Sequence, residues 1–290
     1  NLEDEKFFSF IGWDNIDYDS EELEFFELNS GIFTVLISEL NIQVARGVSP
    51  SSVLNQILLQ HEGEDYQGHS YEDILSFFPT IKIFKIKKES PLYLVKIERI
   101  CSYLLSMNGK NLSLPFTHNT LKSFNKLCLE GATNLNYRTV LFSLSAASWD
   151  YSFLSIYRPL ERLFGIPKIK IFHSKIKASI PLLSLCAEIE AHTGWRPKEE
   201  ESLVFLFEQI STPNVFDPIE EVKKQQGLLE DAKVANFVYK IRNSIVHYRP
   251  GTTAYNFDDQ AWDKLIHGLC DLLKFLYDIY DSDLDSESMH

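Results

Sequence analysis

Apolar residues in the second half of the chain recur three or four positions apart, which is the spacing of an α-helix that packs on one side. This spacing predicts helices over residues 145–164, 174–192, 198–210, 230–247 and 259–280. Glycine follows the first two segments, and Pro250 with Gly251 follows the fourth, as expected where helices end. Pro159 lies inside the first helix and should kink it. Residues 141–290 are therefore predicted to form an all-α helical bundle with an acidic tail.

The first 140 residues show a mixed pattern. The β-branched and aromatic stretches at 31–40 (GIFTVLISEL) and 81–88 (IKIFKIKK) predict strands, and the lysines of the second suit an exposed or edge strand. Helices are predicted from Ser49 or Ser51 to about His61, over 90–107, and over 119–130. The chain is thus expected to be mainly α, with an α+β region at 1–140 for regulation, sensing or partner docking.

Residues 1–28 combine many carboxylates with many aromatic rings. A solvated tail rarely carries so many rings, so we expect this segment to dock on a surface. Packing against its own domain is one interpretation, and docking on a partner protein is the other.

The overall charge limits the function classes. The chain has 28 Lys and Arg against 41 Asp and Glu, for a net charge of −13. This balance argues against coating nucleic acid through bulk charge, but it leaves room for one local phosphate site. No apolar run approaches 18 residues, so no membrane span is predicted, and the visible start does not resemble a signal peptide. The four cysteines show no CxxC spacing, which favours free thiols and a cytoplasmic location.

Most catalytic motifs are absent from the sequence. There is no GxGxxG, GxxxxGK[ST], HExxH or GxSxG. His61 and His69 flank a run of acidic residues that could hold a metal, but their spacing matches no known ligand pattern and a solvated loop is the simpler interpretation. We predict no metal and no cofactor.

The end of the fourth predicted helix carries a more specific combination of residues. Asn243 and His247 are four residues apart on one helix face, so their side chains can touch. Arg242 borders the core-facing stripe and needs a carboxylate or a phosphate as a partner. A histidine that exchanges a proton near neutral pH, beside a permanently charged guanidinium, suits phosphodiester chemistry. A helix-end histidine with an arginine paired to a neighbouring carboxylate is the structural alternative.

The segment Arg242-Asn243-Ser244-Ile245-Val246-His247 resembles the R-x(4–6)-H motif of HEPN domains, in the form with a polar residue after the arginine. HEPN domains are helical bundles of about this size. The aromatic-rich helix from Tyr151 to Glu161 is similar to the opening helix of many of them, and the closing helix 259–280 also fits. The resemblance covers residues 145–281 and says nothing specific about residues 1–140.

The resemblance implies a metal-independent endoribonuclease that acts as a homodimer, with the Arg and His of two subunits in one composite cleft. The ribose 2′-hydroxyl would attack the adjacent phosphorus and leave a 2′,3′-cyclic phosphate and a 5′-hydroxyl. His247 would be the general acid or base, Arg242 would bind the scissile phosphate, and Asn243 would orient His247 or contact the phosphate. Three further residues would help to bind RNA: Lys240, Tyr248 and Arg249. Glu161 would pair with Arg242 and hold it in position.

Many HEPN proteins belong to toxin–antitoxin or anti-phage defence systems, so an antitoxin or another defence protein is an expected partner. Some members have lost the motif and only bind, which makes a non-catalytic adaptor the alternative function. The acidic charge has two explanations. Either the cleft is locally basic, through Lys168, Lys170, Lys175, Lys177, Lys240 and Arg249, or the acidic segment 1–28 shields the site.

Overall fold

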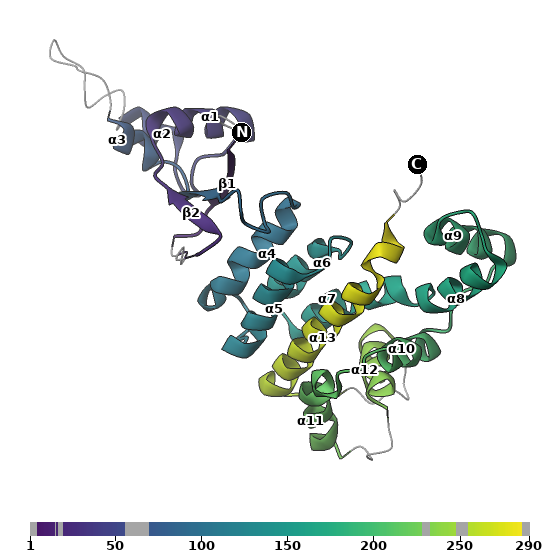
Figure 1. Ribbon diagram of the computed structural model, residues 1–290. Helices are drawn as coiled ribbons and strands as arrows, with labels where there is room; N and C mark the ends of the chain where they lie inside the picture. Colours follow the sequence, from purple (N-terminus) through teal and green to yellow (C-terminus); the bar gives the residue numbers. More distant parts are fainter. Residues whose placement is uncertain are drawn as a thin grey trace, which may run out of the picture. The chain divides into compact units, whose positions relative to one another are not determined.

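The computed structural model describes residues 5–14, 16, 20–55, 70–227, 233–247 and 255–285. These residues are mainly helical, as predicted, and they include one small three-stranded sheet (Figure 1). The chain divides into two compact units, Asn1–Tyr93 and Leu94–His290. None of the described helices combines the length and the apolar composition needed to cross a membrane.

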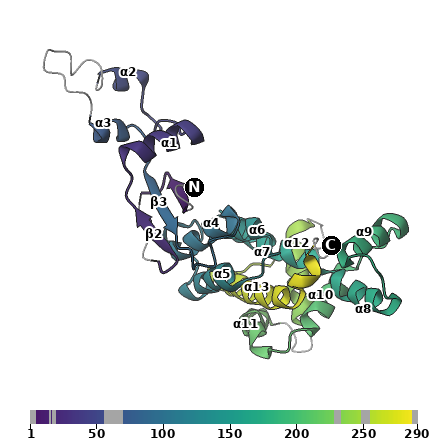
Figure 2. The same cartoon turned by 45° about the horizontal axis from the view of Figure 1, so that its top comes forward.

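The sheet of the first unit is made from segments far apart in the sequence. Its strands are β1 (Lys6–Ile11), β2 (Leu23–Phe26) and β3 (Ile81–Ile86). β3 lies in the centre and runs antiparallel to both neighbours, so Phe84 is opposite Phe8 on one side and Phe25 on the other (Figure 2). The strand predicted at 81–88 is confirmed, but it is a central strand rather than an edge.

Lys85 of β3 is only partly exposed, and acidic residues lie beside it. The Lys85 Nζ is 2.6 Å from Glu5 Oε1, and Glu24 of β2 is opposite Lys85 in the register. The intervening residues of β3, among them Ile83 and Phe84, are buried. The described part of the acidic and aromatic segment 1–28 therefore packs within its own unit, where it supplies two of the three strands.

The strand predicted at 31–40 is wrong, because these residues form a helix. The helices of the first unit are α1 (Ser30–Leu40), α2 (Pro50–Val53) and α3 (Tyr71–Leu75). The Asn29 side chain accepts a hydrogen bond from the Ile32 amide and caps α1. Phe33, Leu36 and Ile37 then pack at helical spacing on Ile81 and Ile83 of the sheet, and this packing outweighs their strand propensity. Ser49 caps α2, and the predicted continuation to His61 lies outside the described residues.

The described residues of the second unit form helices joined by loops and short 3₁₀ turns. The helices, labelled in Figure 1, are α4 (Ile97–Met107), α5 (His118–Glu130), α6 (Tyr137–Leu144), α7 (Trp149–Leu163), α8 (Ile166–Ile176), α9 (Leu182–Thr193), α10 (Glu199–Glu208), α11 (Asp217–Gln225), α12 (Val234–Val246) and α13 (Asp259–Tyr280). The 3₁₀ turns are η2 (Gly109–Asn111), η3 (Pro213–Phe216) and η4 (Asp281–Leu284).

Several predicted boundaries change for local reasons. The helix expected at 174–192 is two helices, α8 and α9, because Lys177 adopts a left-handed conformation with φ of 50° at the end of α8. Pro167 does not prevent α8, since proline fits the first turn of a helix. The helix expected from Ser90 begins only at Ile97, after a stretch of turns. Pro159 lies inside α7 without ending it.

The core of the second unit is arranged around α13, which packs against α5, α7 and α11. Its residues Leu265, Leu269 and Leu273 have no exposed surface. α4 packs against α6, and α5 packs against α13. Residues 94–140 therefore belong to the C-terminal unit. The boundary predicted at residue 140 is therefore displaced, and it falls between Tyr93 and Leu94.

Asp263 of α13 joins that helix to the start of α5. Its buried carboxylate accepts hydrogen bonds from the Thr117 amide at 2.9 Å, the Thr117 hydroxyl at 2.7 Å and the Thr120 hydroxyl at 2.9 Å. Thr117 is the N-cap residue of α5. One carboxylate thus satisfies the free donors at a helix N-terminus and favours that end electrostatically.

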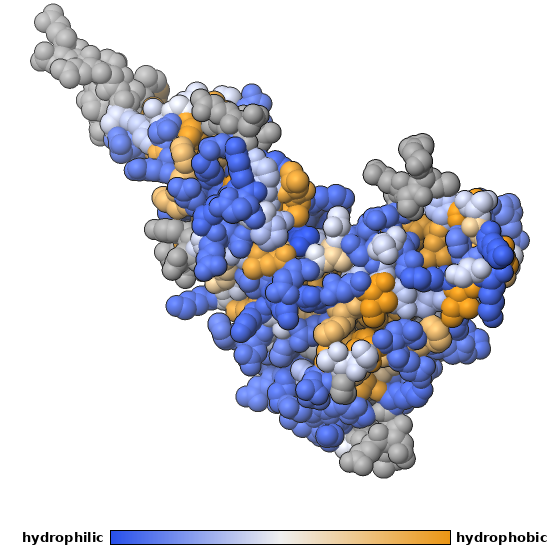
Figure 3. Space-filling model, in the orientation of Figure 1, coloured by the Kyte–Doolittle hydropathy of each residue, from blue (hydrophilic) through white to orange (hydrophobic). Residues whose placement is uncertain are grey.

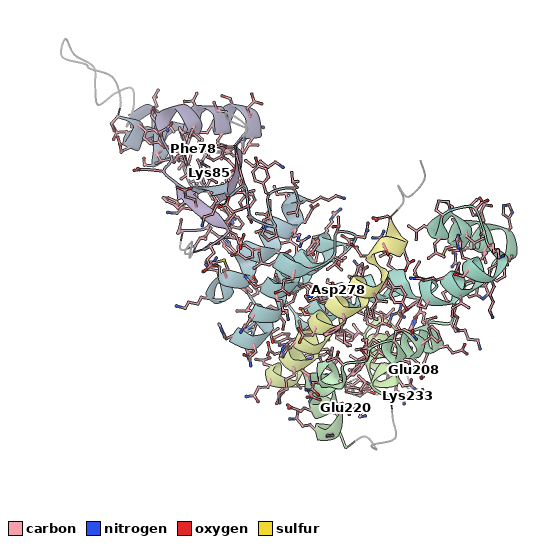
Figure 4. The ribbon with its side chains drawn as sticks, viewed as in Figure 1. Phe78, Lys85, Glu208, Glu220, Lys233 and Asp278 are labelled. Carbon is pink, nitrogen blue, oxygen red and sulfur yellow. The ribbon has the colours of Figure 1, made fainter. Side chains whose placement is uncertain are left out.

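Replacing Asp263 with Ala should lower the free energy of unfolding by about 2–4 kcal/mol, because buried donors lose a charged acceptor. Urea denaturation of the full chain, followed by circular dichroism, measures this change. The control is Asp278→Ala on the same helix, where an exposed carboxylate pairs with Lys274 (Figure 4). The control should change stability by less than about 0.5 kcal/mol. Equal effects of the two variants would contradict the proposed role of Asp263.

Candidate functional site

The candidate residues lie on α12, which forms an antiparallel pair with α10. An ion pair marks each end of this pair. Lys233 Nζ is 2.6 Å from Glu208 Oε1 at one end, and Arg242 Nη1 is 3.2 Å from Glu199 Oε2 at the other. Figure 4 labels Glu208 and Lys233, which point toward one another. The first turn of α10 is thereby held beside the last turns of α12, where the motif lies.

Arg242 is enclosed by carboxylates from two other helices. Its Nη2 lies 3.0 Å from Glu161 Oε1 of α7, in addition to the contact of Nη1 with Glu199. Nη1 also donates a hydrogen bond to Asn243 Oδ1 at 3.1 Å. Only 15% of the Arg242 side chain is exposed. One guanidinium charge is thus opposed by two carboxylate charges within a single chain.

The pairing of Arg242 with Glu161 agrees with the role expected for Glu161, but the contact with Glu199 was not predicted. Glu199 is one of three glutamates in the first turn of α10, where carboxylates also favour the positive end of the helix. Nothing in the sequence pattern indicated that Glu199 turns toward α12. This arrangement also matches the structural alternative of an arginine paired to neighbouring carboxylates.

His247 lies at the end of α12 rather than inside it. Its backbone amide donates to the Asn243 carbonyl at 2.9 Å, and its backbone is extended, with φ of −111° and ψ of 93°. The imidazole is exposed and makes no hydrogen bond to a described residue. No hydrogen bond joins the Asn243 and His247 side chains, and the Asn243 Oδ1 accepts from Arg242 instead. Side-chain spacing on a helix holds only for residues with helical backbone, and His247 has left that conformation.

The residues expected to grip RNA are only partly described. Lys240 is exposed on α12 and forms no ion pair with the residues that the structure describes. Tyr248 and Arg249 lie outside the described residues, as do His61 and His69. Within the described ranges, no group of three or more His, Cys, Asp or Glu side chains could hold a metal ion.

Tyr157 of α7 is buried next to the charged group formed by Arg242, Glu161 and Glu199. Burial raises the pKa of the Tyr157 phenol far above its usual value; Glu161 raises this pKa further, and Arg242 opposes the rise. The hydroxyl has no hydrogen-bond partner among the described residues. Tyr157 therefore stays protonated at physiological pH, and it fills space beneath the charged group without serving as a base.

A hollow of about 390 Å³ runs beside the α10–α12 pair. Its lining includes Lys168 of α8, Glu200 and Glu201 of α10, and Asn236 of α12. Arg242 and His247 are not part of this lining. The hollow thus adjoins the first turn of α10 next to Glu199, and its lining includes two cations, Lys168 and Lys233.

Chemically, the last turns of α12 offer the guanidinium of Arg242, and the end of the helix offers the imidazole of His247. The imidazole of His247 is accessible to a substrate as it stands. The guanidinium of Arg242 can bind a phosphate only by exchanging one of its two carboxylate partners. A search of known protein families, of curated protein sequences and of solved structures found no match for this chain.

Replacing Tyr157 with Phe should leave the free energy of unfolding unchanged or raise it by up to about 1 kcal/mol, because it removes a buried hydroxyl that has no partner. The matched control is Tyr277→Phe. The Tyr277 hydroxyl donates to the Pro159 carbonyl at 3.1 Å, so its loss should cost about 1 kcal/mol. Urea denaturation measures both variants. Greater destabilisation by Tyr157→Phe than by Tyr277→Phe would show that the Tyr157 hydroxyl has a partner after all.

Proposed function

We propose that the C-terminal unit is a HEPN-like all-α bundle and that the protein is a metal-independent endoribonuclease. The observation that carries the proposal is the pairing, on the last turns of α12, of an exposed imidazole with a guanidinium held in place by Glu161 and Glu199. A positioned arginine can stabilise charge on a phosphate and an accessible histidine can move protons, so the two groups suit metal-free cleavage of RNA.

In the proposed reaction, two copies of the chain place their motifs in one cleft. His247 takes the proton of the ribose 2′-hydroxyl or gives a proton to the leaving 5′-oxygen. Arg242 stabilises the charge that develops on the phosphate oxygens, and the products carry 2′,3′-cyclic phosphate and 5′-hydroxyl ends. Lys240 lies on the same helix as these residues and adds a cation for RNA. The proposed enzyme is cytoplasmic, and it acts as a toxin or an anti-phage defence effector with a partner protein.

The two carboxylates around Arg242 hold the active site in a resting state. A phosphodiester carries one negative charge, so its exchange for one carboxylate leaves the local charge balance unchanged. Glu199 is the better candidate for this exchange, because its contact with Arg242 is longer and its side chain is 41% exposed, against 35% for Glu161. Glu161 then remains to orient the guanidinium, which is the role that the resemblance to HEPN domains implies for it.

Arg242→Ala and His247→Ala should each slow the cleavage of RNA in EDTA by at least about 10²-fold, because each removes a group that acts on the reacting phosphate. Gel analysis of a labelled RNA measures the rate, and treatment of the products with phosphatase identifies the cyclic phosphate ends. The controls are His192→Ala, which removes an exposed histidine in the last turn of α9, and Arg138→Ala, which removes an exposed arginine on α6. Both controls should cleave at the unmodified rate.

Undiminished cleavage by the Arg242 and His247 variants would remove these residues from the site. The oligomeric state provides a separate test, since the proposal requires two chains to associate. A molecular mass that stays at that of one chain while RNA is being cleaved would contradict the composite cleft.

Glu199→Gln should raise kcat/KM for RNA about two- to five-fold, because a partly exposed ion pair that competes with the phosphate contributes about 0.5–1 kcal/mol. The gain should appear as a lower KM at an unchanged kcat. Glu221→Gln is the matched control, since it makes the same change of charge and breaks an exposed ion pair with Lys264 on α11, outside the lining of the hollow. A lower kcat in Glu199→Gln would show that Glu199 supports the reaction and does not compete with the substrate.

A second function is favoured by the same ion pairs. If Arg242 serves only to join α7, α10 and α12, the unit is a non-catalytic binding or adaptor subunit of a defence or toxin–antitoxin complex. In that case the unmodified protein does not cleave RNA in any oligomeric state, and Arg242→Ala lowers stability while His247→Ala has no effect.

A further inference from the structure

Helix α8 is basic in a chain that is strongly acidic. Residues 166–177 contain four lysines and no Asp or Glu, whereas the whole chain has a net charge of −13. Lys170 pairs with Asp283, but Lys168, Lys175 and Lys177 are exposed and form no ion pair with the described residues. The structure thus leaves three lysine charges unneutralised on one short element.

The outward side of α8 combines these charges with apolar surface. Ile166, Pro167 and Ile169 face the core, and they leave Lys168, Phe172 and Lys175 on the opposite side at intervals of four and three. The Phe172 side chain is 47% exposed and Ile171 beside it is 49% exposed. With a rise of about 1.5 Å per residue, the two lysines lie about 6 Å and 4.5 Å along the axis on either side of Phe172.

We propose that this stripe of Lys168, Phe172 and Lys175 binds single-stranded RNA. An aromatic ring between cations is the combination that single-stranded nucleic acids use, because a base stacks on the ring while neighbouring phosphates meet the positive charges. The identity of the polyanion as RNA rests on the proposed function. The stripe itself rests on the exposure, spacing and charge of α8.

The distribution of apolar residues favours RNA over an anionic membrane. A helix that lies on a membrane separates its apolar face from its charged face. On α8 the exposed Ile171 and Phe172 lie on the same side as Lys168 and Lys175, and the helix has only 11 residues. Figure 3 shows orange and blue residues interspersed where Figure 1 places α8 and α9.

The stripe begins next to the candidate active site. Lys168 and the glutamates Glu200 and Glu201 line one hollow, and Glu199 is the residue that pairs with Arg242. An RNA strand held on α8 would therefore pass Lys168 and reach the first turn of α10. There its next phosphates compete with Glu199 for Arg242.

The experiment measures binding apart from cleavage. The full chain with His247→Ala is titrated against a fluorescein-labelled single-stranded RNA of twelve nucleotides in EDTA, and the anisotropy is followed at several salt concentrations. We expect Lys168→Ala with Lys175→Ala to weaken binding at least tenfold at low salt and to flatten the salt slope by about 1.4, which corresponds to two phosphate contacts on a single strand. Phe172→Ala should weaken binding about five- to a hundredfold, and Phe172→Tyr should retain it.

The matched control is Lys122→Ala with Lys126→Ala, which removes two exposed lysines from α5 and should leave both affinity and salt slope unchanged apart from a small general charge effect. An equal loss in the control and in the α8 variants would overturn the proposal, because it would show bulk charge only. A failure of the unmodified stripe to bind RNA would also overturn the proposal. So would variants of α8 that lose binding to phosphatidylserine vesicles but keep their binding to RNA.

The result separates this inference from the proposed function. If α8 variants lose RNA binding while Arg242→Ala and His247→Ala cleave normally, the stripe stands and the proposed active site falls. If cleavage depends on Arg242 and His247 but the α8 variants bind and cleave as the unmodified chain does, the stripe falls alone.

Discussion

The guanidinium of Arg242 must keep its positive charge in a place where only 15% of its side chain reaches solvent. Glu161 of α7 and Glu199 of α10 supply the opposing charge, so three helices meet at one side chain of α12. A charge in such a place is tolerated only while its partners remain, and removing one partner costs more than the pair contributes. The end of α12, and with it the position of His247, therefore depends on this group of charges.

Helices with clear start and stop signals could be predicted from the sequence, and those that depend on tertiary contacts could not. α13 is capped by Asp258 and has an uninterrupted apolar stripe, so its limits were predicted correctly. Residues 30–40 carry strand-forming residues, and only their packing on the sheet through Phe33 makes them helical. The central position of β3 could not be predicted either, because it depends on pairing with β1 and β2, two strands distant in sequence, and because Lys85 is paired with Glu5.

At the candidate site, candidate residues could be named from the sequence and their roles stay predictions, but most of their pairing could not be foreseen. The need of Arg242 for an anion follows from its position beside a core-facing stripe, and Glu161 was a correct candidate. Glu199 was missed because an ion pair between helices depends on how α10 and α12 align. The expected approach of the Asn243 and His247 side chains assumed that the helix continues through His247, whereas α12 ends at Val246.

The distribution of charge connects the two proposals. A chain with a net charge of −13 repels RNA at long range, so any affinity has to come from short contacts at a site where positive charge is concentrated. α8 has such unpaired charge, whereas the charge of Arg242 is already neutralised. A free phosphate ion at this site has only Arg242 to bind. It must displace a carboxylate without binding energy from any further contact. If RNA is held on α8 as proposed, its next phosphate would reach Glu199 at a high local concentration, and this difference would let the same ion pair exclude small anions and admit the substrate.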